Sequence, residues 1–593
     1  MSYIIKIESI FLAVILTVLT VISAPFLKPQ AATTATVYIE GTGVGIRSTP
    51  SSANSNNLIE RVSYISGTLL EEVKISDSET WLKISYVKDG VTKEGYVFNN
   101  PEWISVVYYD PDADFETKLA AFPESYREGL RVLHARYPNW EFIPDNINIT
   151  FNEAVYQQTL YLRKLVHLTS QPVSWRSMGL GSYNWNTGEW TNTQGGWTGA
   201  SKEIIAYYMD PRNFLNSSEI FMFMQQSYNS AIQNEEGVNK IIAGTFMEAG
   251  YTPAAGEPYG GSYAKVIMAA AQESGVSPYV IAAKIKQEQG VNGSSSLISG
   301  TRPGYEGYYN FFNVRATGSN SEEVIINGLA YAYNNSWNTR YASIVGGAKF
   351  LGSNYINKGQ DTSYYQDFNV RGNGSHQYAQ AVHDAYNQGV SLAKNYQDNT
   401  DIALSFKIPV YTGMETTAYP KPASSNSLNN YYLSEISVSG LTPSFNMFTN
   451  EYNLAVVGNT AIKVVPVSGA SLVSPSEYAL KAGNNTVVIS VLSEAGNYNY
   501  YVIYVNSAAD CTLYVNSTGT LPDGVASAII GDVNGDGNVN IIDLARVQMH
   551  ILGVKLLAGA AINIGDINGD GNVNIIDLAR IQMHILGVKP IGQ

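Results

Sequence analysis

The stretch "GDVNGDGNVNIIDLARVQMHILGVK" (residues 531–555) is repeated almost unchanged as "GDINGDGNVNIIDLARIQMHILGVK" (residues 565–589). In each copy, oxygen-bearing side chains alternate along a loop of twelve residues whose sixth position is glycine, the spacing of an EF-hand-like Ca²⁺ loop. We therefore expect two calcium ions; two metal-free turns are the alternative. The predicted ligands are Asp532, Asn534, Asp536, Asn538, Asn540 and Asp543, and then Asp566, Asn568, Asp570, Asn572, Asn574 and Asp577.

A helix is predicted after each loop, because Leu544, Val547 and Ile551 share one face and Gly553 ends the run. Two such units over residues 531–593 resemble a type I dockerin, the module that docks onto cohesins of a scaffoldin in cellulosome-forming bacteria. The resemblance implies two Ca²⁺ ions and a cohesin partner. Isoleucine pairs (541–542 and 575–576) stand where dockerins often carry hydroxyl groups, so the choice of cohesin stays open.

Composition bounds the rest of the chain. Its 593 residues are too many for a single hydrophobic core. Its net charge of −14 argues against nucleic-acid binding, and its single cysteine excludes an intramolecular disulfide. Residues 1–32 read as a signal peptide, with Lys6 before the apolar run from Ile10 to Ile22; an uncleaved membrane anchor is the alternative. We therefore expect a protein that is secreted, extracellular or cell-surface associated, without a permanent membrane anchor.

Residues 33–108 alternate like short strands and resemble bacterial Src-homology-3-like wall-binding domains, on "GIRSTPS", "WLKI" and "GYV". Residues 431–507 have period two and resemble the cadherin-like β-sandwich of bacterial surface proteins, a spacer or a wall- or sugar-binding module. The other predicted segments are a mostly helical accessory region (109–250), a catalytic domain (251–400) and two linkers (401–430 and 508–530).

One carboxylate stands out in "GVSPYVIAAKIKQEQG" (residues 275–290). Ser277 and Pro278 suit a helix start, and Glu288 continues the apolar face of Ile281 and Ile285. Removal of Glu288 from water would raise its pKa, and a protonated carboxyl can donate its proton to a leaving oxygen. A surface pair with Lys284, four residues earlier, is the alternative interpretation.

Four ordered motifs give Glu288 a context. The glutamate at a helix end is followed by "YYNFFNV" (308–314), "IVGGAKFLGSNYI" (344–356) and "GSHQYAQAVHDAY" (374–386). This order resembles the β-N-acetylglucosaminidases of glycoside hydrolase family 73. This resemblance implies a catalytic domain with a lysozyme-like α+β fold. Together with the other resemblances, it predicts a multidomain protein that also has a small β-barrel, a β-sandwich and EF-hand-like calcium-binding helical modules.

The same resemblance assigns roles to residues. Glu288 matches the general acid and Tyr378 an active-site tyrosine, while Tyr309, Asn310, Phe312 and Gln377 are the predicted substrate-binding residues. Asn313 stands where the family usually has glycine, and Gln380-Ala381 replaces the usual residues after the tyrosine. The second carboxylate is predicted at Glu322 or Glu323, with Glu306 as the alternative, and attack by the substrate's own N-acetyl group is a second route.

Two other groups are weaker candidates. His376 and His383 lack nearby acidic or cysteine ligands, so structural roles are favoured over a metal site. Trp185, Trp190 and Trp197 either line a glycan groove or pack beneath a loop.

The sequence therefore predicts a cell-wall hydrolase that cleaves the β-1,4 bond after N-acetylglucosamine in peptidoglycan glycan strands, without a cofactor for catalysis. A lytic transglycosylase, which needs one glutamate, and a non-catalytic wall-binding surface protein are the alternatives.

Overall fold

The computed structural model describes residues 34–591 except 40, 42, 54, 64, 89–90, 110–111, 194, 397–400, 526–528 and 559. The predicted signal peptide lies outside the described residues. Within them, no helix is both long enough and apolar enough to cross a bilayer. The chain divides into two compact units. The first combines residues 1–146, 214–363 and 388–410, and the second combines residues 147–213, 364–387 and 411–593.

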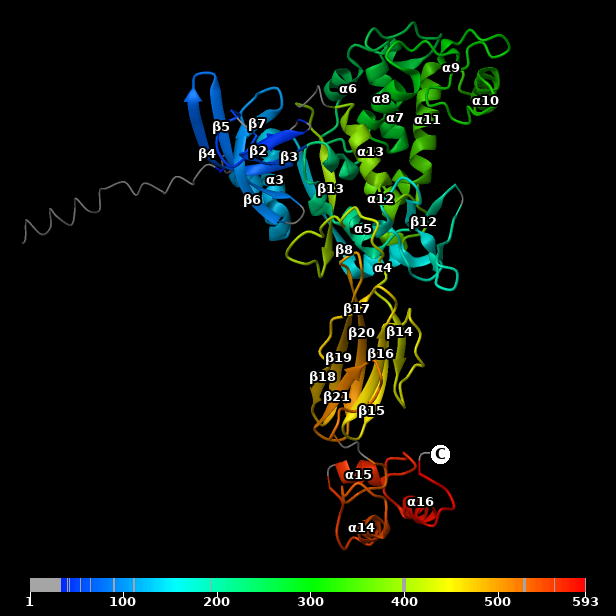
Figure 1. Ribbon diagram of the computed structural model, residues 1–593. Helices are drawn as coiled ribbons and strands as arrows, with labels where there is room; N and C mark the ends of the chain where they lie inside the picture. Colours follow the sequence, from blue (N-terminus) through cyan, green and yellow to red (C-terminus); the bar gives the residue numbers. More distant parts are fainter. Residues whose placement is uncertain are drawn as a thin grey trace, which may run out of the picture. The chain divides into compact units, whose positions relative to one another are not determined.

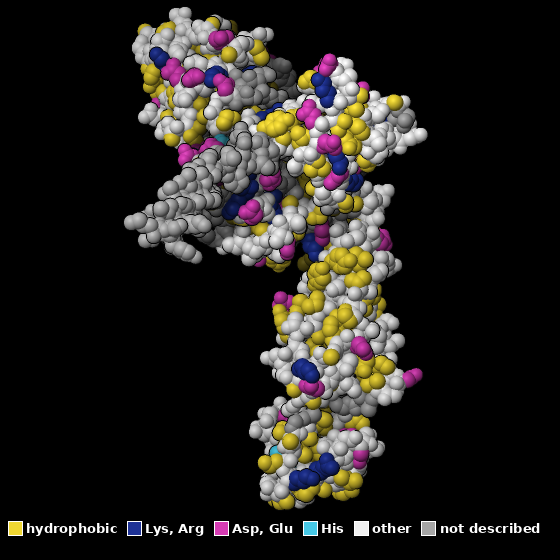
Figure 2. Space-filling view, turned by 90° about the vertical axis from the view of Figure 1, so that its left-hand side faces the viewer, with side chains coloured by type: hydrophobic (Ala, Val, Ile, Leu, Met, Phe, Trp, Pro, Cys, Tyr) yellow, Lys and Arg dark blue, Asp and Glu magenta, His cyan; other side chains and the backbone are white. Residues whose placement is uncertain are grey.

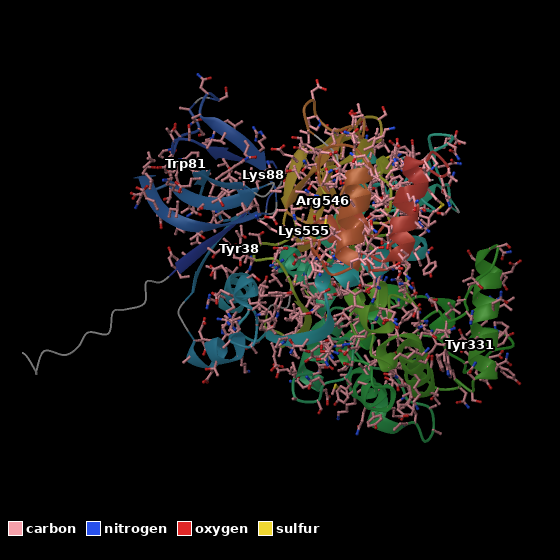
Figure 3. All side chains as sticks on the ribbon, turned by 90° about the horizontal axis from the view of Figure 1, so that it is seen from below. Tyr38, Trp81, Lys88, Tyr331, Arg546 and Lys555 are labelled. Atoms are coloured by element: carbon pink, nitrogen blue, oxygen red, sulfur yellow. The ribbon has the colours of Figure 1, made fainter. Side chains whose placement is uncertain are left out.

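The first unit begins with a seven-stranded sheet in the order β3-β2-β6-β5-β4-β1-β7 (Figure 1). Buried valine, isoleucine and leucine side chains from alternate strand positions form its core. Trp81 and Lys88 both lie on β5, as labelled in Figure 3. The strands are β1 (Thr34–Ile39), β2 (Val44–Arg47), β3 (Leu58–Val62), β4 (Ile65–Ser76), β5 (Glu79–Lys88), β6 (Val91–Phe98) and β7 (Ile104–Tyr109).

Helices make up most of the remaining first unit, where α7 packs on α8 and α11, and α6 packs on α7 and α8. The described part of residues 251–396 contains no strand, so the expected α+β character does not come from the predicted catalytic segment. Strands β8 (Glu141–Thr150) and β13 (Ser405–Thr412) pair with each other, and both lie outside the predicted catalytic segment. The helices are α2 (Ala113–Leu119), α3 (Glu124–Arg136), α6 (Glu235–Ile242), α7 (Tyr263–Ser274), α8 (Pro278–Gln289), α9 (Ser296–Ser299), α10 (Ser321–Asn334) and α11 (Arg340–Asn354).

Helix α8 begins and ends where the sequence predicts. Pro278 is its first residue, and Gly290 follows the last turn with φ of 69°, a conformation that glycine adopts freely. Ser277 is the N-cap, but its side chain makes no capping hydrogen bond, contrary to the expectation from its residue type. Seven of the first eight residues of the helix are buried, which fixes the orientation of its last turn.

The second unit holds an ion pair that joins two distant segments. Lys164 and Asp367 are fully buried, with Nζ 2.6 Å from Oδ1, and Nζ also donates to the carbonyl oxygens of Asp367 and Ala379. Burial raises the pKa of the Asp367 carboxyl. Residues 364–387 therefore pack with residues 147–213, so the predicted domain boundary at residue 250 does not separate independent bodies.

This part of the second unit also contains short elements. They are α4 (Phe151–Thr159), α5 (Lys202–Met209), β9 (Leu165–His167), β10 (Tyr183–Asn184), β11 (Glu189–Trp190) and β12 (Trp197–Gly199). Helices α12 (Ser363–Phe368) and α13 (Asp384–Ala393) cross the boundary between the units.

The β-sandwich has two four-stranded sheets, β14-β16-β21-β18 and β15-β20-β19-β17. Inward side chains from both sheets fill one core, and Met178, Trp185 and Trp190 of the preceding region pack against it. The strands are β14 (Leu433–Ser437), β15 (Glu451–Val456), β16 (Thr460–Pro466), β17 (Ser471–Leu472), β18 (Glu477–Leu480), β19 (Gly483–Leu492), β20 (Tyr498–Ser507) and β21 (Cys511–Asn516).

Both predicted linkers contain ordered structure, and these predictions were wrong in part. Residues 405–412 of the first form β13, and the indole nitrogen of Trp175 donates to the carbonyl of Pro422 (3.2 Å) further along it. Residues 511–516 of the second form β21, which pairs with β16 and β18. Polar composition suggested a linker, but these segments have tertiary partners that composition does not reveal.

The repeated segment folds as two loop–helix units with α14 (Ile541–Ile551) and α16 (Ile575–Ile585), joined through α15 (Ala560–Gly565). Val533, Val547 and Ile581 are buried where α14 and α16 meet. Both positions at which the copies differ therefore lie in or against this small core: Val547 and Ile581 at one, and Val533 with the partly buried Ile567 at the other. Arg546 and Lys555 belong to the first copy and are labelled in Figure 3.

We predict that Asp367→Asn destabilises the protein by about 3–5 kcal/mol, because it leaves the Lys164 ammonium buried without its counter-charge. The matched control is Asp510→Asn, which breaks the exposed pair with Lys481 (2.8 Å) in the same unit. Chemical denaturation followed by fluorescence measures both. Equal effects of the two variants would show that the buried pair has no special role.

Candidate active site and calcium loops

Glu288 lies in the last turn of α8, and its carboxylate is held by two polar partners. Oε1 is 2.7 Å from Nζ of Lys284, and Oε2 accepts a hydrogen bond from Nδ2 of Asn313 (2.8 Å). The side chain is 23% exposed. The ion pair that was the alternative interpretation is therefore formed, and the carboxylate is partly exposed rather than removed from water. Glu288 is nevertheless fixed rather than free on the surface.

Asn313 replaces the glycine usual at this position, and its backbone explains why. Its φ is 52°, in the left-handed region, where asparagine is the side chain that is tolerated best after glycine. The side chain forms a relay: Nε2 of buried Gln289 donates to Oδ1 of Asn313 (2.8 Å), which leaves Nδ2 to donate to Glu288. Nε2 of Gln289 also donates to the carbonyl of Phe311 (2.9 Å). Gln289 was not predicted from the sequence, because no sequence pattern distinguishes this glutamine from any other next to a glutamate.

Two predicted substrate-binding residues are buried. Asn310 has no exposed surface, and it bonds Val314 in both directions and donates to the carbonyl of Gly328 (2.9 Å). Phe312 is also buried, against Gly347 of α11. These contacts correct the prediction: both residues shape the turn that carries Asn313, and neither presents a surface to a ligand. Tyr309 is half-buried, under the guanidinium of Arg340.

The candidates for a second carboxylate have other partners. Glu322 pairs with Arg302, and Glu323 accepts hydrogen bonds from the amide of Ser319 (2.7 Å) and Nδ2 of Asn320 (3.0 Å) at the start of α10. Glu306 accepts from the amide of Gly304 (3.0 Å). No hydrogen bond or ion pair among the described residues joins any of them to Glu288. Glu323 has the contacts of a helix cap.

Tyr378 and Gln377 belong to the second unit. Tyr378 is 57% exposed, and its amide donates to the carbonyl of Gln366 (2.7 Å). Nε2 of Gln377 donates to Oε1 of Gln158 (2.6 Å), so it has a partner within its own unit. The assignment of both residues to the active site stays a prediction.

The remaining aromatic and histidine candidates have structural contacts. The indole nitrogens of Trp185 and Trp190 donate to the carbonyls of Met178 (3.1 Å) and Ser177 (3.2 Å). Trp197 packs edge-on against His167. Nδ1 of His383 lies 3.0 Å from Nε2 of Gln171, and burial lowers the pKa of His383. These contacts match packing beneath a loop rather than a glycan groove.

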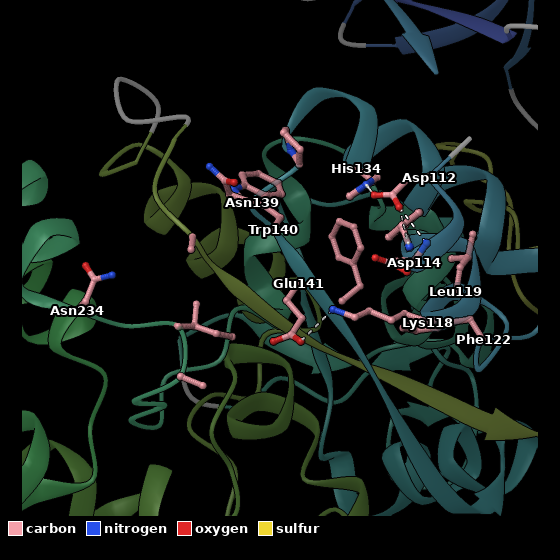
Figure 4. Close-up of a pocket in the computed structure, with 16 residues that line it drawn as sticks. Asp112, Asp114, Lys118, Leu119, Phe122, His134, Asn139, Trp140, Glu141 and Asn234 are labelled. Carbon is pink, nitrogen blue, oxygen red and sulfur yellow. Dashed lines mark hydrogen bonds and ion pairs between the residues drawn. The ribbon is translucent and has the colours of Figure 1, made fainter. Parts of the chain in front are cut away.

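A separate cavity of about 460 Å³ lies in the first unit (Figure 4). In it, Nε2 of His134 is 3.1 Å from Oδ2 of Asp112, and Lys118 is 3.9 Å from Glu141. The amide of Phe115 and the His134 contact hold the pKa of Asp112 below its usual value. None of the residues predicted for catalysis lines this cavity.

The two repeated loops have the backbone turns of the predicted calcium loops, although among the described residues no three acidic or histidine side chains converge as a metal site requires. Gly537 and Gly571 have φ of 89° and 86°, which gives the sharp turn expected at the sixth position. Asp543 and Asp577 are fully buried, and each accepts two backbone hydrogen bonds that close its loop. The carboxylate and amide oxygens of these loops are the ligand type that a hard divalent cation prefers, so the residues present fit Ca²⁺ by their chemistry.

Comparison with known proteins finds similarity for two parts of the chain, the repeated C-terminal segment and the region related to glucosaminidases. Residues 530–587 match the family model of the Dockerin type I domain. The chain is 30% identical over 226 residues to the β-N-acetylglucosaminidase of Bacillus subtilis, which covers 37% of this chain and 24% of that protein. It is 28% identical over 228 residues to a bifunctional autolysin of Staphylococcus epidermidis, which covers 36% of this chain and 16% of that protein.

Among solved structures, S. aureus glucosaminidase B is 23% identical, with a TM-score of 0.34 and coverage of 46% of this chain and 94% of that one. The predicted resemblances to glucosaminidases and to a type I dockerin are confirmed by the sequence relatives and the family model. The matched part spans about a quarter or less of each of these relatives' own length.

We predict that Asn313→Ala lowers the free energy of unfolding by about 1–2 kcal/mol relative to Asn313→Gly. Both variants lose the relay to Glu288, but only alanine is strained at a φ of 52°. Thermal and chemical denaturation of the pair isolates the backbone contribution. Equal stability of the two variants would contradict the left-handed conformation.

Proposed function

We propose that this protein is a cell-wall hydrolase, a glycoside hydrolase that cleaves β-1,4 bonds after N-acetylglucosamine in peptidoglycan. The observation that carries the proposal is the fixed carboxylate of Glu288, positioned by Asn313 and Gln289 in a chain related to glucosaminidases and autolysins. We further propose an extracellular or cell-surface location, because the named relatives act on walls or sugars and the chain carries a dockerin module.

Glu288 is assigned the role of general acid. Oε2 accepts a hydrogen bond from Asn313, so we assign to Oε1 the proton that is donated to the glycosidic oxygen. Lys284, whose side chain is partly exposed, must move from Oε1 for this to happen. Departure of the leaving group is then helped by proton transfer, while water or the substrate's acetamido oxygen attacks the sugar carbon.

A lytic transglycosylase is the second candidate. One observation favours it: the predicted second carboxylates have partners other than Glu288. Such an enzyme needs one glutamate, and its product carries a 1,6-anhydro end instead of a reducing end.

The dockerin module is proposed to bind two Ca²⁺ ions and a cohesin. Each loop would hold its ion through its own Asp and Asn oxygens, and calcium supplies the charge that keeps these oxygens together. Ile541, Ile542, Ile575 and Ile576 at the starts of α14 and α16 are all more than half exposed. An apolar patch is therefore the expected feature of the cohesin surface that binds here.

Glu288→Gln should reduce the release of reducing sugars from purified peptidoglycan by about 10²–10⁴-fold, the usual contribution of a general acid. Glu273→Gln is the matched control, because Glu273 also pairs with a lysine on the same lobe (Lys349, 2.8 Å). Full activity of the Glu288→Gln variant would contradict the assignment of Glu288 as general acid.

Calcium titration of the full chain by calorimetry should give two bound ions. Asp543→Ala should reduce this number to one, since it removes a buried ligand from the first loop only. Asp523→Ala, outside both loops, is the control. Unchanged stoichiometry in the Asp543 variant would contradict the assigned ligands.

A further inference from the structure

One strand of the β-sandwich presents a row of tyrosines to solvent. On β20, Tyr498, Tyr500 and Tyr504 are 45%, 50% and 45% exposed, while the alternate residues face the core. The rings of Tyr498 and Tyr500 are parallel within 8°, with centroids 6.3 Å apart. These exposed rings on the outward face of one strand form an aromatic surface, which we call the tyrosine platform.

Few charges lie beside the tyrosine platform. Glu451, exposed on the paired strand β15, is in register with Val502, and Nζ of Lys202 donates to the carbonyl of Tyr498 (2.9 Å). On the paired strand β19, Thr486, Val488 and Ser490 are in register with Tyr504, Val502 and Tyr500. None of the outward residues on β19 and β20 is acidic or basic. Figure 2 shows hydrophobic side chains, tyrosine included, over the sandwich surface with scattered charged ones. An exposed aromatic surface with few charges suits a ligand with an apolar face and polar edges.

A cavity of about 550 Å³ continues the tyrosine platform within the second unit. Tyr500 lines it, together with Tyr156, Tyr419, Lys202 and Glu203. Tyr156 is exposed, which gives the cavity a further aromatic face. The cavity size and its mixture of aromatic and few polar groups are typical of a ligand site.

Glu203 gives the cavity an unsatisfied polar atom. Its Oε1 is buried and has no hydrogen-bond partner, while Nζ of Lys202 lies 3.8 Å away. Burial raises the pKa of the Glu203 carboxyl. Its free oxygen can therefore form a hydrogen bond with a neutral hydroxyl group of a ligand. A buried polar atom without a partner has a free-energy cost that a ligand hydroxyl would remove.

A sugar in a β-1,4-linked chain has this complementary chemistry. Its ring carries C–H groups on its faces, which pack on tyrosine rings, and hydroxyl groups at its rim. We propose that the tyrosine platform and the adjoining cavity bind a glycan strand of peptidoglycan, outside the catalytic lobe. The choice of peptidoglycan rests on the proposed function and on Lys202, whose ammonium suits the carboxylates of stem peptides. The platform would then hold the protein on its polymeric substrate.

The test is a pull-down of the full chain with insoluble, purified peptidoglycan, in the Glu288→Gln background so that the polymer stays intact. The variant is Tyr500→Ala with Tyr504→Ala, which removes two exposed rings. Tyr514→Ala, on β21 of the opposite sheet, is the matched control. Melting temperatures of all variants check that the sandwich stays folded.

The double variant should bind peptidoglycan at least about fivefold more weakly, the effect of losing two aromatic contacts, while the control binds normally. Equal binding of the double variant and the control would overturn the proposal. Binding to crystalline cellulose is measured in parallel. A double variant that binds cellulose more weakly but peptidoglycan normally would also overturn the proposal.

The two proposals fail separately. With Glu288 intact, the double variant should cleave soluble glycan fragments at the normal rate, because its changes lie outside the catalytic lobe. Absence of cleavage by every Glu288-containing form, together with weakened peptidoglycan binding of the double variant, would reject the hydrolase and support the platform. Slow cleavage of soluble fragments by the double variant alone would reject the platform as a separate binding site.

Discussion

The hydrogen-bond relay from Gln289 through Asn313 to Glu288 is the constraint on which the account of catalysis depends. Buried Gln289 sets the orientation of the Asn313 amide, and that amide holds one oxygen of the Glu288 carboxylate. The relay requires Asn313 to be in the left-handed conformation, which asparagine adopts at moderate cost. Asn313 thus both turns the backbone and fixes the candidate acid.

The modules around this relay are held by different kinds of interaction. The buried pair of Lys164 and Asp367 joins segments that are far apart in sequence, and it stabilises the second unit by satisfying two charges at once. The sandwich shares its core with the tryptophan-containing loops before it. In the dockerin module, a small core between α14 and α16 holds the two loop–helix units together.

Local patterns in the sequence predicted the elements that local chemistry determines. The start and end of α8 at Pro278 and Gly290, the glycines of the calcium loops and the alternation of β20 all follow from short-range preferences. The surroundings of Glu288 could not be predicted in this way, because Asn313 reaches it from 25 positions away through a turn shaped by buried Asn310. Strand β13 was likewise missed, since its partner β8 lies far upstream.

The central claim is that the chain hydrolyses the bond after N-acetylglucosamine, and the chemistry of the product ends tests it most directly. Mass spectrometry of purified peptidoglycan digested with the full chain distinguishes the possible ends. The account predicts fragments that end in reducing N-acetylglucosamine. Fragments that end in 1,6-anhydro-muramic acid would contradict it and identify a transglycosylase instead.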